Sequence, residues 1–301
     1  MRKKKEKLNR TSVIQSYLMI SVSTIGLFTF VVLPLLWIVR WCMFSYRGFG
    51  EPTFVGLDHF VRAFTRTPKY WMAVGNTFVF AICKLAIEIS MALVLGYMLT
   101  KRLRGTTFFR SIYFMPSMIS VAIIGVIFTY FFAHNTGILN NILTSFGLKP
   151  VKWFSNPVTA MITIMIASIW QGFGVNMIYF ITGFNSIDVS LYESAQLDGA
   201  SNSQQFFRVT LPMLGPVLQM VVMNALLGSL KTMDLVLTLT NGRPNGRTEV
   251  MMTYVYKQFF PQGGTATDYG FGSALTVITA VILAIVTAVY LKLSQKRSEV
   301  Y

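Results

Sequence analysis

Charged residues are scarce in this sequence. Asp, Glu, Lys and Arg make up 12% of the 301 residues, whereas hydrophobic residues make up 53%. A soluble globular domain contains about 25% charged residues, and the mean hydropathy of this chain is +0.56. The composition therefore excludes an ordinary soluble protein and indicates a membrane protein.

Acidic residues are the scarcer charged type, with 11 Asp and Glu against 26 Lys and Arg and a net charge of +15. Such a surplus can indicate nucleic-acid binding. However, six of the basic residues lie within Arg2–Arg10, directly before an apolar run. Basic residues at the ends of apolar runs are typical of cytoplasmic segments attracted to anionic lipid. We therefore expect membrane lipid, and not nucleic acid, as the partner of these charges.

Cysteine and histidine are rare, with two of each, and a nucleotide-binding motif is absent. Cys42 and Cys83 suggest neither a disulfide framework nor a metal site, and His59 and His134 are isolated in the sequence. The pattern G-x-x-x-x-G-K-[ST], which cradles nucleotide phosphates, does not occur. We therefore expect no catalytic residue, metal or cofactor in this chain. If its function is driven by ATP, the ATP and Mg²⁺ are bound by another protein.

The chain does contain six apolar stretches, each long enough to cross about 30 Å of hydrocarbon as a helix. We predict an all-α transmembrane domain over residues 17–292, between a basic tail at 1–16 and a tail at 293–301. The first stretch lacks a cleavage site of small residues, so we expect a retained helix and not a signal peptide. The predicted spans are residues 17–39, 71–99, 108–133, 158–182, 209–230 and 270–291.

An even number of spans places both termini on one side of the membrane. Counted by loop, that side carries 14 Lys and Arg and the other side 11, of which residues 40–69 alone hold five. Positive charge is enriched in cytoplasmic loops, so we expect both termini in the cytoplasm. The outer connections are then residues 40–70, 134–157 and 231–269, none long enough for a separate domain.

Two charged residues lie inside the second predicted span. Lys84 and Glu88 are four residues apart and therefore share one helical face. Either charge alone in lipid would cost several kcal/mol, so we expect the two to pair or to face a polar interior. They could contact substrate or gate its pathway, or they could be a structural pair that neutralises itself.

The fourth and fifth predicted spans also carry polar residues. Small residues beside them allow close helix approach, and an aromatic ring next to amides suits the flat C–H face of a sugar. Helix packing with amide hydrogen bonds explains the same pattern equally well. The residues concerned are Trp170, Gln171, Gly172, Gly174, Asn176 and Asn224.

Residues 185–216 form the one polar, turn-rich connection between spans and should face the cytoplasm. Ser190 and Glu193 fit a capping box that begins a short helix, which we expect to end near Leu197 because Gly199 favours a helix stop. Ser201-Asn202-Ser203-Gln204 repeats the cap pattern and predicts a second helix. That helix would run into the fifth span, bent at its start by Pro212 and Pro216. A compact helix–turn–helix at the membrane surface could dock into a soluble partner or could simply connect two spans.

This connection resembles the EAA loop of bacterial binding-protein-dependent ABC importer permeases. The residues that carry the resemblance are Glu193-Ser194-Ala195, Asp198-Gly199-Ala200, Phe206, Leu211-Pro212 and Pro216. The flanks are similar to the carbohydrate branch of the family, from about Tyr17 to Lys292. They include Asn76-Thr77, Gly105, Phe108-Phe109-Arg110, Pro116, Gly137-Ile138-Leu139-Asn140, Leu230-Lys231-Thr232-Met233-Asp234, Leu239–Pro244, Thr248, Gly270 and Ser273-Ala274.

The resemblance implies the six-helix fold of a type I ABC importer permease in a bacterial plasma membrane. It implies a second, similar permease as partner in a heterodimer, two ATPase subunits, an extracytoplasmic solute-binding protein and a sugar substrate. The ATPase-coupling residues that it implies are Tyr192, Glu193, Ser194, Ala195, Asp198, Gly199, Ala200, Phe206 and Pro212. The sequence departs from the family at Ser194, where the first of two alanines is usual, at Asp188, a frequent proline, and at Arg243, a frequent glycine.

Two other functions remain open at this point. A secondary transporter could use Lys84 and Glu88 as an ion relay, although the sequence shows no internal repeat. A membrane scaffold or enzyme would work without an ATPase or a binding protein. The candidate substrate pathway of the importer comprises Trp170, Gln171, Asn176, Asn224, Lys84 and Glu88.

Overall fold

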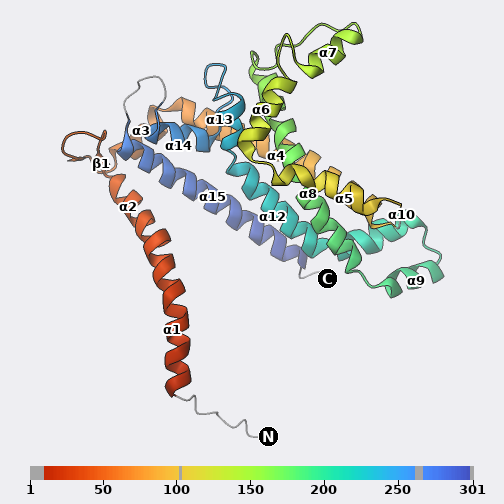
Figure 1. Cartoon of the computed structure of the whole chain (residues 1–301). Coiled ribbons are helices and arrows are strands. Elements are labelled where there is room, and N and C mark those ends of the chain that lie inside the picture. The colour runs from red at the N-terminus through yellow and green to blue at the C-terminus, as the bar shows by residue number, and fades with distance from the viewer. Residues whose placement is uncertain (1–9, 102–103, 262–266, 299–301) are drawn as a thin grey trace. The chain divides into compact units, whose positions relative to one another are not determined.

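The computed structural model describes residues 10–101, 104–261 and 267–298, and the described chain is almost entirely helical (Figure 1). Residues 1–9 of the predicted basic tail and residues 299–301 of the C-terminal tail lie outside the described residues. The chain divides into two compact units. Unit 1 comprises residues 1–66 and 257–278, and unit 2 comprises residues 67–256 and 279–301.

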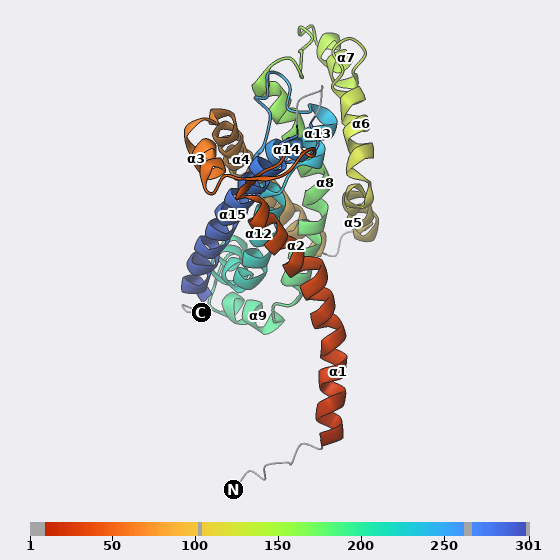
Figure 2. The same cartoon turned by 90° about the vertical axis from the view of Figure 1, so that its left-hand side faces the viewer.

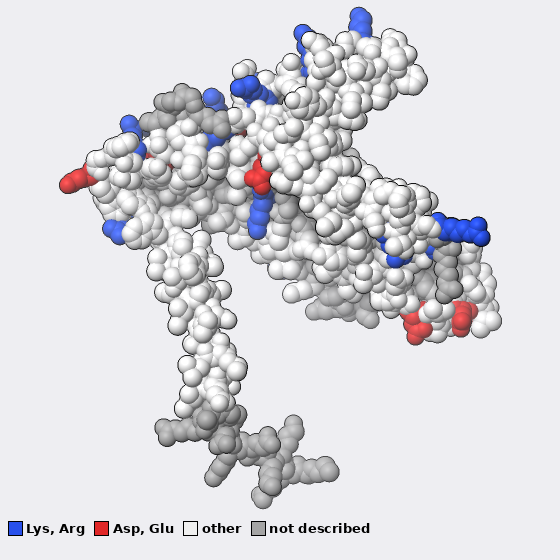
Figure 3. Space-filling view, viewed as in Figure 1, with Lys and Arg blue, Asp and Glu red and all other residues white. Residues whose placement is uncertain are grey.

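Unit 1 begins with one long apolar helix. Its parts are α1 (Arg10–Leu27), a π-helical turn (Phe28–Val32) and α2 (Leu33–Trp41). The widened turn directly precedes Pro34, whose ring clashes with the carbonyl four residues earlier in a regular α-helix. Residues 14–41 are long and apolar enough to span a membrane, in agreement with the predicted first span. Residues 14–27 of α1 contain no Asp, Glu, Lys or Arg, and this part of the helix is white in Figure 3.

The rest of unit 1 is a small cap at the end of this helix. Strand β1 (Phe44–Ser45) pairs antiparallel with β2 (Thr53–Phe54), and α3 (Asp58–Thr65) follows. The end of α14 (Met251–Phe259) and the start of α15 (Tyr269–Ser298) complete the unit. The connection at residues 40–70 therefore contains a hairpin and a helix that its turn-forming residues did not predict.

Unit 2 is built on α4 (Pro68–Thr100), α8 (Pro157–Asn185) and α12 (Gly215–Leu230), which pack on one another. Pro68 and Pro157 stand in the first helical turn, where a missing N–H costs nothing. Asn156 caps α8 by accepting a hydrogen bond from the amide of Val158 at 2.8 Å. The second, fourth and sixth predicted spans each lie within a helix long enough to cross a membrane: residues 68–100, 157–185 and 269–295.

The third predicted span is not one continuous helix, which corrects the expectation for residues 108–133. α5 (Thr106–Phe114) runs into a 3-10 turn (Met115–Met118) and then α6 (Val121–Phe131), with a bend of 101°. Pro116 lies in the 3-10 turn, and Ile119 and Ser120 leave helical geometry altogether. The chain stays close to α8 here because Gly174 has no side chain: a Cβ there would collide with the carbonyl of Tyr113.

The fifth predicted span is also broken, as its prolines indicated. A π-helical turn (Phe206–Thr210) and α11 (Leu211–Met213) precede α12, and the two segments meet at 66°. Pro212 stands in the first turn of α11 and Pro216 in the first turn of α12. The predicted bend at Pro212 and Pro216 is therefore confirmed. By length and composition the chain has four membrane-spanning helices among its described residues, or six if each bent pair is one span.

The connections of unit 2 carry short helices at its two ends. α7 (Ile138–Ser145) and α9 (Val189–Leu197) lie at opposite ends of the unit in both views (Figure 1 and Figure 2). α7 is held by the buried amide of Asn140, which donates to the carbonyls of His134 and Val151 at 2.9 Å each. Near it lies α13 (Asp234–Leu239), packed on α6. The helices α7 and α9 precede and follow the fourth predicted span, so their positions at opposite ends agree with a chain that crosses the membrane between them.

The contact between α4 and α8 contains a buried ionic group between two apolar clusters. Lys84 Nζ lies 3.1 Å from Glu88 Oε2, and Asn176 donates to Glu88 Oε1 at 2.8 Å. Glu88 is 2% exposed. Gly172 makes room for this carboxylate, because a Cβ at that position would lie 2.5 Å from Oε1. The predicted pairing of Lys84 with Glu88 is confirmed. Asn176 of α8 is a third member of this buried group.

The clusters on either side of this group are apolar. One contains Phe80 from α4 and Ala167 from α8, together with residues of α6 and α13. The other contains Ala92 from α4 and Met177 from α8, together with Leu214 and Val221. The ionic group therefore occupies the middle of the helix pair, where water has no access and each polar atom needs a protein partner.

Removing the acid alone should damage the fold. In Glu88→Leu the Lys84 ammonium stays buried without its carboxylate, which costs about 3–5 kcal/mol. The double variant Lys84→Met/Glu88→Leu should regain most of that loss, because both charges are replaced by apolar groups of similar volume. Thermal unfolding in detergent measures the difference.

The exposed Lys149 provides a control, and Lys149→Met should leave the unfolding temperature unchanged. A double variant as unstable as Glu88→Leu would contradict a pair whose role is structural.

Candidate functional site

The candidate site is the connection at residues 185–216, in which α9 and α10 (Asn202–Gln205) form the predicted helix–turn–helix. The first cap differs from the prediction. α9 begins at Val189, and its cap is Asp188, whose Oδ1 accepts from the amide of Ser190 at 3.0 Å. Ser190 is therefore inside the helix and not its cap, and no capping box with Glu193 forms.

The physical reason is that an aspartate caps a helix as well as a serine does, so the earlier residue starts the helix. The hydrogen bond from the Ser190 amide also holds the pKa of Asp188 below its usual range. Asp188 was noted in the sequence only as a departure from a frequent proline. Its place two residues before Ser190 was the signal that could have identified it as the cap.

The turn between the two helices follows the prediction. α9 ends at Leu197, and Gly199 has a φ of 78°, a left-handed conformation that glycine adopts without strain. The amide of Ala200 donates to the carbonyl of Ala195 at 2.9 Å, and that of Gly199 to Gln196 at 3.0 Å, which is the Schellman arrangement. Ser201 and Gln204 then form the predicted reciprocal capping box.

The loop is tied to the ends of the long helices by side chains. The Tyr192 hydroxyl lies 3.0 Å from the hydroxyl of Thr210, and Gln205 donates to the carbonyl of Ala200 at 3.0 Å. The ring of Phe206 stacks edge-on against Tyr97 near the end of α4, with ring centroids 4.9 Å apart. Between these groups is a cavity of about 250 Å³. The loop is thus connected to α4 as well as to its neighbours in the chain.

Sequence reasoning identified Tyr192 and Phe206 but missed their partners. Thr210 carried the hydroxyl that Tyr192 needs, yet no spacing rule connects residues 18 positions apart in an irregular loop. Tyr97 belongs to another span, so only the fold reveals it.

The outer surface of the loop combines acidic and apolar groups. Leu197 is 90% exposed, and Glu193, Ser194, Asp198 and Gly199 are exposed beside it. Acidic atoms are concentrated at α9 in Figure 3. Ala195, Ala200 and Pro212 are half-buried toward the rest of the chain. The loop is therefore a rigid projection whose free side could fit a complementary cleft.

The residues named as a candidate substrate pathway are only partly brought together. Asn176 joins Lys84 and Glu88 in the buried group between α4 and α8. Trp170 and Gln171 are half-buried on α8, and the Trp170 ring packs against Phe128 with centroids 5.6 Å apart. Asn224 is exposed on α12. Within the described residues, no group of three or more His, Cys, Asp or Glu side chains could hold a metal ion.

Comparison with known proteins agrees with this geometry. Residues 89–299 match the family of binding-protein-dependent transport system inner membrane components. The chain is 28% identical to the probable ABC transporter permease protein YesP of Bacillus subtilis, over 97% of this chain and 94% of the relative. It is 29% identical to the trehalose/maltose transport system permease protein MalF of Thermococcus litoralis, over 94% of this chain and 94% of the relative.

The fold is similar to that of a solved chain. A bacterial ABC transporter involved in the import of the acidic polysaccharide alginate has a chain with a TM-score of 0.82 and 25% identity, covering 95% of this chain and 96% of the other. The relatives are permease subunits of transporters, so the prediction of a transport subunit and not an enzyme is confirmed. The long apolar helices, the projecting loop and the match over more than two thirds of its length show that this multi-pass membrane chain belongs to the family of inner membrane components of binding-protein-dependent transport systems.

Proposed function

We propose that this chain is the permease subunit of an ABC importer and forms half of the translocation pathway for a sugar or oligosaccharide. The observation that carries the proposal is the projecting loop at residues 185–216, which has two capped helices, an exposed acidic and apolar surface, and side-chain ties to α4. A sugar is the substrate class because one relative is the permease of a trehalose/maltose transport system and the similar solved chain belongs to a transporter involved in alginate import.

The loop docks on a separate ATPase in this proposal. The chain has no phosphate-binding motif of its own, so ATP and Mg²⁺ are bound by two ATPase subunits below the membrane. Closure of the ATPases moves α9, and the Tyr192–Thr210 and Phe206–Tyr97 contacts transmit that movement to the long helices. Such a change is driven when the ATPases bind one arrangement of the long helices more tightly than the other. The remaining partners are a second permease of the same family in a heterodimer and a solute-binding protein.

Replacing Gly199 by valine should uncouple transport from ATP hydrolysis. The Cβ would meet no neighbour, but a non-glycine residue in the left-handed conformation costs about 1–2 kcal/mol. That strain depopulates the docking-competent turn by roughly 5- to 30-fold. We expect sugar uptake by the complete transporter in proteoliposomes to fall by a similar factor, and ATP hydrolysis to lose its stimulation by the sugar-loaded binding protein.

Gly147 provides a matched control at the other end of unit 2. It also has positive φ, 76°, with no neighbour that a Cβ would meet, at the end of α7. Gly147→Val imposes the same backbone strain, and we expect it to leave the coupling ratio of ATP hydrolysed to sugar transported unchanged. Unaltered coupling in Gly199→Val would refute the role of the loop.

The substrate pathway in this proposal includes Trp170, Gln171 and Asn176 of α8, with Lys84 and Glu88 behind them and Asn224 on α12. Trp170→Ala would also remove a ring that packs on Phe128, at a cost of about 3–5 kcal/mol. Trp170→Phe keeps an aromatic ring against Phe128 but removes the second ring of the indole and its N–H, and so reduces the surface on which a sugar could lie. We expect it to raise the KM for sugar uptake several-fold with little change in unfolding temperature.

Phe128→Leu alters the same packing from the α6 side and serves as the control. It should lower the unfolding temperature without changing the KM. If Trp170→Phe and Phe128→Leu affect KM and stability alike, Trp170 has no contact with sugar.

Both termini and the loop lie in the cytoplasm in this proposal. Leu197→Cys, 90% exposed on the loop, should react with a membrane-impermeant maleimide only after cells are permeabilised. Phe146→Cys, 79% exposed after α7, should react in intact cells. The native thiols contribute little at neutral pH: burial raises the pKa of Cys42 to about 11, and Cys83 lies within a span. Labelling of Leu197→Cys in intact cells would reverse the assignment.

A further inference from the structure

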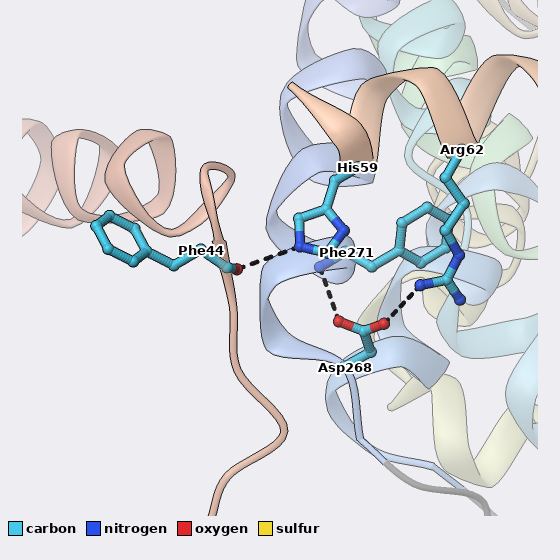
Figure 4. Close-up of polar contacts among 5 residues, drawn as sticks. All are labelled: Phe44, His59, Arg62, Asp268 and Phe271. Atoms are coloured by element: carbon cyan, nitrogen blue, oxygen red, sulfur yellow. Dashed lines mark hydrogen bonds and ion pairs between the residues drawn. The ribbon is translucent and has the colours of Figure 1, made fainter. Parts of the chain in front are cut away.

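Helix α3 packs on the start of α15 through one face only. His59 lies 3.2 Å from the carbonyl of Phe44, and Arg62 Nη1 forms a 2.7 Å ion pair with Asp268 (Figure 4). The Arg62 guanidinium also lies over the Phe271 ring, 4.0 Å from its centroid. Ala63 is fully buried on the same side. The inner side of α3 therefore holds the polar and charged contacts.

The opposite face of α3 is apolar and exposed. Leu57, Val61 and Phe64 are spaced by four and three residues, so they share one face, and they are 65%, 55% and 59% exposed. The hairpin before α3 is similar, with Phe49 94% and Phe54 68% exposed. A connecting helix in water normally turns its polar face outward. This helix instead exposes its apolar face beside the exposed Asp58 and Thr65, which requires a medium or partner that covers apolar side chains.

An aromatic group in the same unit marks where the membrane surface lies. Trp37 and Trp41 stand at the end of the first span, and Trp41 contacts Tyr46 with ring centroids 5.1 Å apart. Tyr46 in turn stacks on Tyr269, the first residue of α15. Trp and Tyr gather at the interface between lipid tails and water. Tyr269 directly follows Asp268, which is ion-paired with Arg62 of α3. Helix α3 therefore lies at the same membrane interface as this aromatic group.

The chain and its charges point to the same medium. The first span ends at Trp41 and the next begins at Pro68, so residues 42–67 connect two spans along one membrane surface. Residues 40–69 contain five basic residues and two acidic ones, Glu51 and Asp58, a net charge of +3. Positive charge beside an exposed apolar face is complementary to anionic lipid headgroups. Attraction to anionic lipid also explains why this connection is basic, although the total of Lys and Arg predicts that the opposite side of the membrane is the cytoplasmic one.

We propose that α3 and the β1–β2 hairpin are an interfacial anchor, with Leu57, Val61, Phe64, Phe49 and Phe54 inserted at the boundary between headgroups and acyl chains of an anionic bilayer. The anchor goes beyond the transport function and does not depend on the substrate or on which side of the membrane the first span ends. It holds the ends of the first and last spans of unit 1 at a fixed depth through the Arg62–Asp268 pair.

Spin labels test the depth of this face. Single cysteines replace Val61, Phe64 or Phe49 in a Cys42→Ser/Cys83→Ser background, and each variant is co-expressed with its transporter partners and placed in nanodiscs of phosphatidylethanolamine and phosphatidylglycerol. Oxygen partitions into the bilayer, whereas a neutral nickel chelate stays in water. We expect the labels at Val61 and Phe64 to relax faster with oxygen than with nickel, at a depth of about 5–10 Å.

Two further positions calibrate the result. Phe30, 79% exposed in the first span, should report lipid, and Phe146, 79% exposed after α7, should report water. Labels at Val61 and Phe64 that behave like Phe146 would overturn the anchor. Labels shielded from both reagents would overturn it in favour of a protein cover, and a shift on adding the solute-binding protein would identify that cover. Loss of uptake in Gly199→Val bears only on the transport function.

Discussion

The hydrogen bond from Asn176 to the carboxylate of Glu88 is the contact on which the packing of unit 2 depends. It closes the interface of the two longest helices in the unit, and the Lys84 ammonium supplies the opposite charge from the same helix as Glu88. Gly172 lets the backbone of α8 approach closely enough for the bond to form. With one oxygen of Glu88 hydrogen-bonded to Asn176 and the other ion-paired with Lys84, the apolar clusters on either side pack around a neutral group.

The pair of helices α4 and α8 fixes the position of the candidate coupling loop. α8 leads directly into α9, and α4 presents Tyr97 to Phe206, so both partners of the pair contact the loop. The bend between α11 and α12 then turns the chain back into the membrane-spanning part. The loop is therefore connected to α4, α8 and α12, and in the proposed coupling a movement of α9 reaches all three. Helix caps at both ends of the turn fix its backbone conformation.

The sequence predicted most of the framework because apolar length and turn chemistry are local properties. The long helices, the stop at Gly199 and the box at Ser201 and Gln204 each depend on a few neighbouring residues. The cap at Asp188 was missed because two acceptable caps stood two residues apart and the patterns alone do not rank them. The 101° break at Met115–Ser120 was missed because an apolar run looks the same whether it is straight or folded against α8.

Contacts between distant segments were out of reach for a different reason. Lys84 and Glu88 could be paired from their spacing, but their third member, Asn176, is 88 residues away from Glu88. Likewise α3 was predicted only as part of a connection between spans. Its apolar spacing at Leu57, Val61 and Phe64 is present in the sequence, but only the fold shows that His59 and Ala63 pack inward and that the apolar face is exposed.

The pairing of Lys84 with Glu88 has a consequence for how the chain is made. During synthesis α4 emerges long before α8, so its charges must enter the membrane region without Asn176. Because the acid and the base are one helical turn apart, they form a neutral pair as soon as α4 has formed. The helix therefore carries its own counter-charge through insertion, and α8 is needed only to complete the hydrogen bonding. A partner charge on a later helix would instead leave the charge on α4 unpaired, at a cost of several kcal/mol, until that helix was made.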